Sequence, residues 1–220
     1  RFIAIMSLVF PSGLSFGQPG GKPFFFSEVG WSLVIPADFK IMDSLDDRAK
    51  NEQGKKLIEK STDIIADYSE TKTPISATKG QLNNFNATVT PFDPVTDGDH
   101  DDANKSVKDI LHKTFRDQLP SGKIDTISTS ISIDGLEFDK FQLTISQDET
   151  VIVNMVLISK LYKGFDFGIS YVYVDQQTKE QIESMLNESR FVADWQDKCN
   201  KRNIHTDQLL ALFFKLETTA

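Results

Sequence analysis

The acidic segment DGDHDDAN, residues 97–104, holds the densest group of polar side chains that could do chemistry in this chain. Asp97, Asp99 and Asp101 alternate along it, and carboxylates at alternate positions can direct their oxygens at one Ca²⁺ ion. A calcium loop of the EF-hand type also needs Gly at its sixth position and Glu at its twelfth, and neither is present when positions are counted from Asp97. The missing ligands favour a solvated turn that caps the next helix, and they leave a weak Ca²⁺ site as the only cofactor this segment suggests.

A second candidate site is the aromatic stripe in FDFGISYVY, residues 165–173. Phe167, Tyr171 and Tyr173 share one face of the strand that this alternation predicts. Such a row could form the floor of a ligand pocket, although aromatic strands more often bury their larger face in a core. Tyrosine hydroxyls need hydrogen-bond partners, so we expect the Tyr171–Tyr173 end to be the end nearer water.

The other reactive residue types show no catalytic spacing. His100, His112 and His205 are not spaced as zinc ligands, and each is expected at the surface. The chain contains no Gly-x-Ser-x-Gly elbow and no glycine-rich phosphate loop placed between a strand and a helix. Cys199, the single cysteine, has no evident base partner. These patterns favour a binding protein over an enzyme.

Period-2 alternation of apolar and polar residues predicts most of the strands. They are expected at residues 31–35, 75–78, 85–91, 124–133, 136–146, 151–161 and 165–173, with a further short strand at 63–69. Asp134-Gly135 is a strong signal for a two-residue hairpin turn, and Lys163-Gly164 marks another turn. The four segments from 124–133 to 165–173 are therefore expected to form a four-strand meander.

One irregularity stands out within this meander. The apolar positions change parity between Phe138 and Phe141, and we expect a β-bulge near Asp139 and Lys140 to account for it.

Three segments have helical character. Residues 107–119 carry apolar residues at helical spacing, with Asp101, Asp102 or Asn104 as the expected N-cap. Residues 43–61 form a weaker amphipathic pattern, and a last helix is expected to begin at Thr178 with Gln181 completing a capping box. The order of elements predicts an α+β fold, with an antiparallel sheet and helices packed on its faces.

Composition limits the class of partner. The 220 residues carry a formal net charge of −8 at pH 7, and 39% are hydrophobic, including 17 Phe, which is enough for a substantial core. An acidic chain without a basic face is not expected to bind nucleic acid.

The two ends of the chain differ from the middle. Residues 1–17 resemble a signal peptide whose apolar run is too short to span a membrane, with a cleavage position before Gln18. Residues 18–24 are expected to be a flexible leader, 25–192 the folded domain, and 193–220 an atypical apolar tail. We therefore expect an exported protein, periplasmic or extracellular, without a membrane span.

Four stretches resemble the PsbP-like fold superfamily, which includes Mog-type and DcrB-like proteins. They are Gly30–Phe39, Asp134–Phe141, Gly164–Val174 and Ile182–Phe191. The motifs IPADFKIMD, GKKLIEKS, TVTPF, IDGLEF and KGFDFG also resemble a group of uncharacterised exported bacterial proteins of that type. The resemblance implies a PsbP-like sandwich that binds partners, and it brings no shared active site.

Two functions are consistent with these observations. The first is an exported, non-enzymatic binding or envelope-associated protein whose partner is an envelope protein or a small ligand. The alternative is a metal-dependent or hydrolytic enzyme that uses the acidic segment Asp97–Asp102 together with His100.

Overall fold

The computed structural model describes residues 20–43, 52, 55–56, 59–60 and 69–192. The expected signal peptide and the C-terminal tail lie outside these residues, as do most of the expected helix 43–61 and nearly all of the expected strand 63–69.

The described residues form two antiparallel sheets and the helices α2, α3 and α4, and residues 52, 55–56 and 59–60 are also helical, within the expected helix 43–61. The strands are β1 (Lys22–Phe26), β2 (Trp31–Ile35), β3 (Lys40–Ile41), β4 (Lys72–Lys79), β5 (Asn83–Pro91), β6 (Lys123–Ile133), β7 (Leu136–Gln147), β8 (Thr150–Tyr162), β9 (Phe165–Tyr173) and β10 (Arg190–Phe191). The helices are α2 (Pro94–Asp97), α3 (His100–Gln118) and α4 (Gln176–Glu188).

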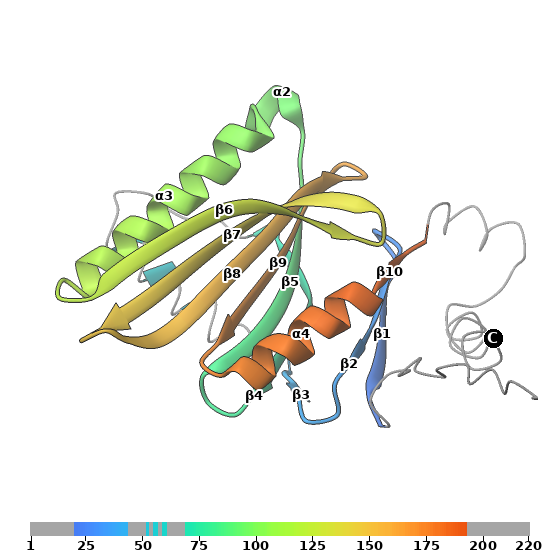
Figure 1. Ribbon diagram of the computed structural model, residues 1–220. Helices are drawn as coiled ribbons and strands as arrows, with labels where there is room; N and C mark the ends of the chain where they lie inside the picture. Colours follow the sequence, from blue (N-terminus) through green and yellow to red (C-terminus); the bar gives the residue numbers. More distant parts are fainter. Residues whose placement is uncertain (1–19, 44–51, 53–54, 57–58, 61–68, 193–220) are drawn as a thin grey trace, which may run out of the picture.

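The larger sheet has seven strands in the order β3-β4-β5-β9-β8-β7-β6, and the smaller has the order β1-β2-β10. Strands β6 to β9 follow one another in the sheet, so the predicted four-strand meander is confirmed. Helix α3 lies on one face of the larger sheet, and α4 lies with the smaller sheet on the other (Figure 1). The fold is therefore α+β, as the sequence predicted.

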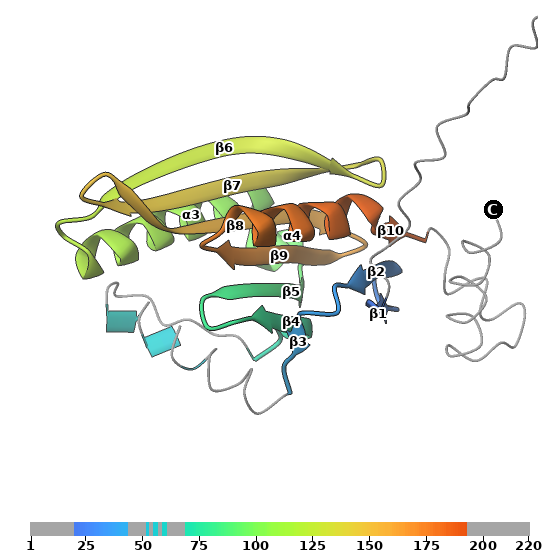
Figure 2. The same ribbon diagram turned by 60° about the horizontal axis from the view of Figure 1, so that its bottom comes forward.

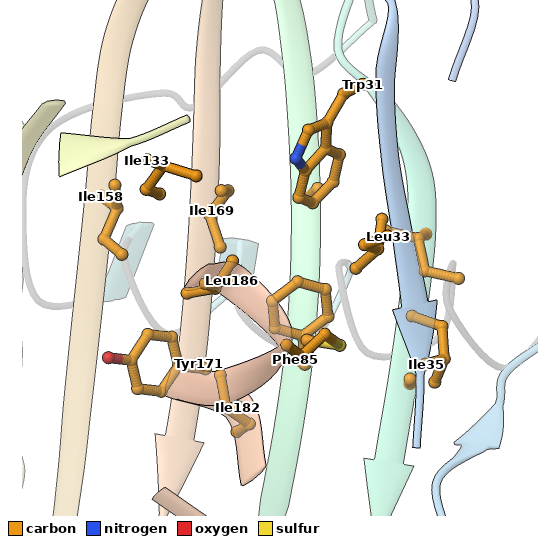
Figure 3. Close-up of a cluster of buried hydrophobic side chains, with 14 of the residues drawn as sticks. Trp31, Leu33, Ile35, Phe85, Ile133, Ile158, Ile169, Tyr171, Ile182 and Leu186 are labelled. Atoms are coloured by element: carbon orange, nitrogen blue, oxygen red, sulfur yellow. The ribbon is translucent and has the colours of Figure 1, made fainter. Parts of the chain in front are cut away.

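The larger core lies between α4, the smaller sheet and the larger sheet. Trp31, Leu33 and Ile35 alternate along β2 and are all buried there, which is the period-2 pattern that the sequence shows. They face buried side chains of β5, β8, β9 and α4 (Figure 3). The end of β10 lies close to Gly30, just before β2, where the Gly30 oxygen accepts a 2.8 Å hydrogen bond from the Val192 N–H. Glycine is required at this position, because its φ is 72° and a Cβ would lie 2.6 Å from the Val192 oxygen.

A smaller core lies under α3. Its buried members are Phe141, Leu143 and Ile145 of β7. Partly buried apolar side chains surround them, from α3, its C-terminal cap, β6 and β8: Phe115, Leu119, Ile124, Val153 and Leu157.

The two cores explain the change of parity in β7, and the predicted bulge near Asp139 and Lys140 is wrong. The β6–β7 register runs without interruption from the Ile133–Leu136 pair to the Lys123–Ser146 pair. Phe138 points into the larger core while Phe141 points into the smaller one, because the strand passes from beneath one covering layer to beneath the other. The irregularity in β7 lies between Ile145 and Ser146, against β8.

Both predicted helix caps are also corrected. The side chain of Asp99 caps α3, and that of Asp175 caps α4. Thr178 is the third residue of α4, where its backbone N–H and its hydroxyl both donate to Asp175. Capping depends on the backbone conformation before the helix, and several Asp, Asn and Thr residues near each start could have served.

The N-terminal boundary differs from the expected one as well. Strand β1 begins at Lys22, so the last three residues of the expected flexible leader are paired with β2. Pro23 is tolerated there because β1 is an edge strand of the smaller sheet.

Candidate functional site

The structure does not bring the three carboxylates of the predicted calcium site together. Asp97 accepts a 2.7 Å hydrogen bond from the Asp93 N–H at the start of α2. Asp99 accepts from the N–H groups of Asp101 and Asp102, while the side chain of Asp101 is exposed in the first turn of α3. Within the described ranges no three His, Cys, Asp or Glu side chains are grouped so as to hold a metal ion. Weak Ca²⁺ binding stays a prediction.

His100 is not the surface residue that its sequence position suggested. Its side chain is only 12% exposed, and its Nε2 lies 3.1 Å from the Asp166 Oδ1. Its Nδ1 lies 3.4 Å from Asn104, and its ring meets Phe92 edge-on with 5.3 Å between centroids. The pair joins the start of α3 to β9. No local sequence signal could have revealed the contact between His100 and Asp166, because these two residues are 66 positions apart in the chain.

Phe167 lies deep in the larger core. Its ring is edge-on to Trp31 at 5.2 Å and to Phe191 at 5.8 Å, and it is fully buried. For Phe167, this packing supports the interpretation that the aromatic stripe belongs to the hydrophobic core. A ligand could reach Phe167 only if the smaller sheet moved away.

Tyr171 and Tyr173 are buried as well, so the end of the stripe that was expected to lie nearer water is not accessible to solvent. Their rings stack at 6.1 Å. Burial, together with the negative charge of Glu183 on α4, raises the pKa of both hydroxyls. The Tyr171 hydroxyl is buried without a hydrogen-bond partner among the described residues, and it points towards β8 and away from Phe85 (Figure 3). A ligand role for Phe167, Tyr171 and Tyr173 stays a prediction.

Beside these tyrosines, part of the same sheet face is not covered by a described helix. Helix α4 packs on β2 and β9, and α3 lies on the opposite side of the sheet, which leaves β6, β7 and the first half of β8 open (Figure 1). We call this surface the open face. The strand register places six neutral residues of this surface on the same side as Tyr171: Ile127, Thr129, Gln142, Thr144, Val151 and Asn154. The charged Lys123, Asp125 and Lys140 lie on that side at its margin.

The open face combines exposed apolar groups with neutral hydrogen-bonding groups. Ile127 is 59% exposed and Val151 is 53% exposed. Thr144 donates a 2.9 Å hydrogen bond to Asn154, and Gln142 donates to Thr144. The Lys140–Glu183 ion pair, 3.7 Å between charged atoms, stands at the boundary with α4. Sequence reasoning missed this surface, because apolar alternation does not show which face of a strand is covered.

The described residues also form a hollow between α4 and the β1–β2 hairpin. Its volume is about 60 Å³, well below the several hundred Å³ of a typical small-molecule site. It is lined by Gly21, Val34, Pro36, Gln181, Ser184, Met185 and Glu188.

None of the described helices has both the length and the apolar character that crossing a bilayer requires.

Comparison with known proteins gives a likeness of fold and no match in sequence. No family model matches the chain, and no curated protein matches it. The solution structure of cyanobacterial PsbP (CyanoP) from Synechocystis sp. PCC 6803 superposes with a TM-score of 0.51 at 10% identity, over 84% of this chain and 99% of that one. The chain therefore has a PsbP-like fold, as the sequence resemblance implied.

Two other solved structures match less well. A protein from Bacteroides thetaiotaomicron gives a TM-score of 0.43 at 10% identity, over 80% of this chain and 50% of that one. LpqN of Mycobacterium tuberculosis, described as involved in cell envelope biogenesis, gives 0.36 at 12% identity, over 80% of this chain and 87% of that one.

Proposed function

We propose that this protein is an exported, envelope-associated binding protein that holds a protein partner on its open face. The observation that carries the proposal is the exposure of Ile127 and Val151 on a sheet face that no described helix covers. Protein interfaces combine apolar contacts with neutral hydrogen-bonding groups, and Gln142, Thr144 and Asn154 supply such groups between the two apolar residues. The PsbP-like fold is compatible with this role, although fold alone does not carry function.

A protein partner suits this surface better than a small molecule does. The residues of the open face lie on three neighbouring strands, and the nearby tyrosines are sealed under α4. The hollow beside α4 is too small for a typical small ligand. The six residues of the open face carry no charge, and the exposed Lys123 and Asp125 beside them on the same side form an ion pair with each other, so recognition here rests mainly on shape, apolar contact and hydrogen bonds.

Site-specific crosslinking tests the binding surface. A photo-crosslinking residue in place of Thr144 is expected to capture one defined partner in the cell envelope, whereas the same residue in place of the exposed Ser106 on α3 is expected not to capture it. The captured protein is then purified and titrated with the unmodified chain and with Ile127→Arg. Loss of a central apolar contact should weaken binding about tenfold or more.

The result that would overturn the binding surface is equal capture from both positions, or an affinity that Ile127→Arg leaves unchanged. Because Ile127 is mostly exposed, this variant should fold normally, and its melting temperature provides the check.

Export is tested separately by mass spectrometry. If residues 1–17 are a signal peptide, the mature protein begins at Gln18 and is recovered from the periplasm or the medium. A cytosolic product that retains the residues before Gln18 would refute export.

A further inference from the structure

Strand β6 is one edge of the seven-stranded sheet, and it is long, exposed and uncharged over most of its length. It pairs with β7 over eleven residues without a bulge, and residues 125–130 are all exposed. In Figure 2 no described segment lies beyond β6 at this edge of the sheet, and α3, which contacts β6, lies on one face of the sheet. No charged residue and no proline occur from Thr126 to Ile133.

Proteins normally protect such an edge, because its unpaired backbone groups can template pairing with another strand. The usual devices are a very short edge strand, a charged side chain in mid-strand, a proline or a bulge. The opposite edge of the same sheet follows this rule, since β3 is only two residues long. The β6 edge has none of these devices between Asp125 and Asp134, which indicates that it is a pairing surface.

The hairpin turn determines which backbone groups of β6 are free. The turn has two residues, Asp134 and Gly135, both with positive φ, so Ile133 and Leu136 flank it as a hydrogen-bonded pair. Hydrogen-bonded positions alternate along an antiparallel strand, so odd-numbered residues of β6 direct their N–H and C=O groups at β7. Among the described residues, the backbone groups without a strand partner are those of the even-numbered residues: Ile124, Thr126, Ser128, Ser130 and Ser132.

We propose that the β6 edge pairs antiparallel with β6 of a second copy of this chain, so that two seven-stranded sheets become continuous. A two-fold axis at Thr129 places Ile127 opposite Ile131 of the second copy and Ser128 opposite its Ser130. β-branched and hydroxyl-bearing residues form favourable cross-strand pairs, and this register makes the isoleucine contact twice. Asp125 then faces Ile133 of the second copy, so this register does not place Asp125 opposite another negative charge.

This symmetry determines where the other surfaces lie. The axis is perpendicular to the sheet, because only that orientation keeps paired residues on the same face of an antiparallel pair. The two α3 helices therefore lie on one side of the dimer, and the two open faces lie together on the other. Each copy carries a formal charge of −8, so their repulsion is screened by salt and association is expected to strengthen as ionic strength rises.

The experiment measures the mass of the purified protein by analytical ultracentrifugation, up to about 100 µM and at low and moderate salt. A dimer that gains population with concentration and salt is expected. Ser128→Pro removes one outward N–H without touching the β6–β7 ladder, as prolines on edge strands do, and is expected to give a monomer with a nearly unchanged melting temperature. The matched control Ser128→Thr keeps the N–H and should remain a dimer.

Backbone hydrogen exchange provides a second measurement. The amides of Thr126, Ser128 and Ser130 should exchange quickly at low protein concentration and become protected at high concentration, whereas those of Ile127 and Thr129 should be protected at both. A protein that is monomeric at every concentration overturns the proposal. A dimer that Ser128→Pro leaves intact, or one without added protection at the even-numbered amides, overturns it equally.

Discussion

The two faces of the seven-stranded sheet are covered in different ways. One face carries both α4 and the three-stranded sheet, and the core beneath them includes fully buried aromatic residues such as Trp31, Phe85 and Phe167. The other face carries α3, and among the described residues the buried members of the core beneath it are Phe141, Leu143 and Ile145 of β7. Single residues of the first face should therefore carry more of the stability than those of the second.

The sheet is left open on the face that has the larger core. Helix α4 packs on β2 and β9 and closes this face around Tyr171. No described helix covers the same face at the start of β8, and the open face begins there. The five predictions that follow test this contrast, from the largest expected effect to the smallest.

Phe85→Ala should cause the largest loss. Phe85 is fully buried in the larger core, and removing a buried phenyl ring leaves a cavity that costs about 3–5 kcal/mol in free energy of unfolding. Urea denaturation of the variant gives the value. A loss below that of Phe115→Ala would reverse the ranking of the two cores.

Phe115→Ala should cost less, about 2 kcal/mol, because the Phe115 ring is only partly buried against the smaller core. His112→Ala on the same helix is the control and should change the free energy of unfolding little, since its neighbour Arg116 lies only at the limit of hydrogen-bond distance, 3.5 Å. The same urea titration measures both. Equal losses for the two variants would mean that α3 faces the sheet differently.

Asp99→Ala should cost about 1 kcal/mol, because it leaves two N–H groups of the first turn of α3 without their acceptor. Asp101→Ala, two residues later and exposed, should have little effect, and Asp99→Asn should retain most of the cap. Thermal unfolding monitored by circular dichroism compares the three. A larger loss from Asp101→Ala than from Asp99→Ala would contradict the assignment of the cap.

Tyr171→Phe should leave stability unchanged or raise it by up to about 1 kcal/mol. The variant keeps the buried ring and removes a hydroxyl that has no partner in the described part of the chain. Denaturant unfolding measures the change. A clear loss of stability would show that the hydroxyl binds a group, such as a water molecule or a ligand, beneath α4.

The cap of α4 should make stability depend on pH. Hydrogen bonds from the Thr178 N–H and hydroxyl, with a further one from Asn83, hold the pKa of the Asp175 carboxyl below its usual range. Because the folded-state pKa lies below the unfolded value, the ionised carboxylate stabilises the fold above about pH 4, and this contribution is lost as the pH falls through the depressed pKa.

Asp175→Asn isolates this effect, because asparagine still caps a helix but does not ionise. Between pH 6 and pH 3 the unmodified protein should lose more unfolding free energy than the variant does. Parallel loss in the two proteins would assign the acid sensitivity to other carboxyls, of which Asp38, bonded to Lys79 at 2.8 Å, is the first to test.

Much of the fold could be predicted because its signals are local. Period-2 alternation, and for β8 a nearly continuous apolar run, located β5 to β9 to within a few residues, and Asp134-Gly135 and Lys163-Gly164 are turns as expected. Helix α3 was recognised from its apolar spacing, although its start was placed a few residues too late. The candidate sites were predicted less well, because Asp97 and Asp99 accept from separate backbone groups, Asp101 is exposed, and His100 meets a residue of a distant strand.

The sequence by itself determined the strand periods, the turns and the order of elements, since each depends on backbone preferences within a few residues. Only the tertiary structure decided which face of each strand is covered. Phe138 and Phe141 illustrate this: both are large and apolar, and they enter different cores because α4 and α3 pack on opposite sides of β7. Covering depends on elements that are remote in the chain. For the same reason, only the packed structure reveals the open face and shows that β6 is an edge strand of the described sheet.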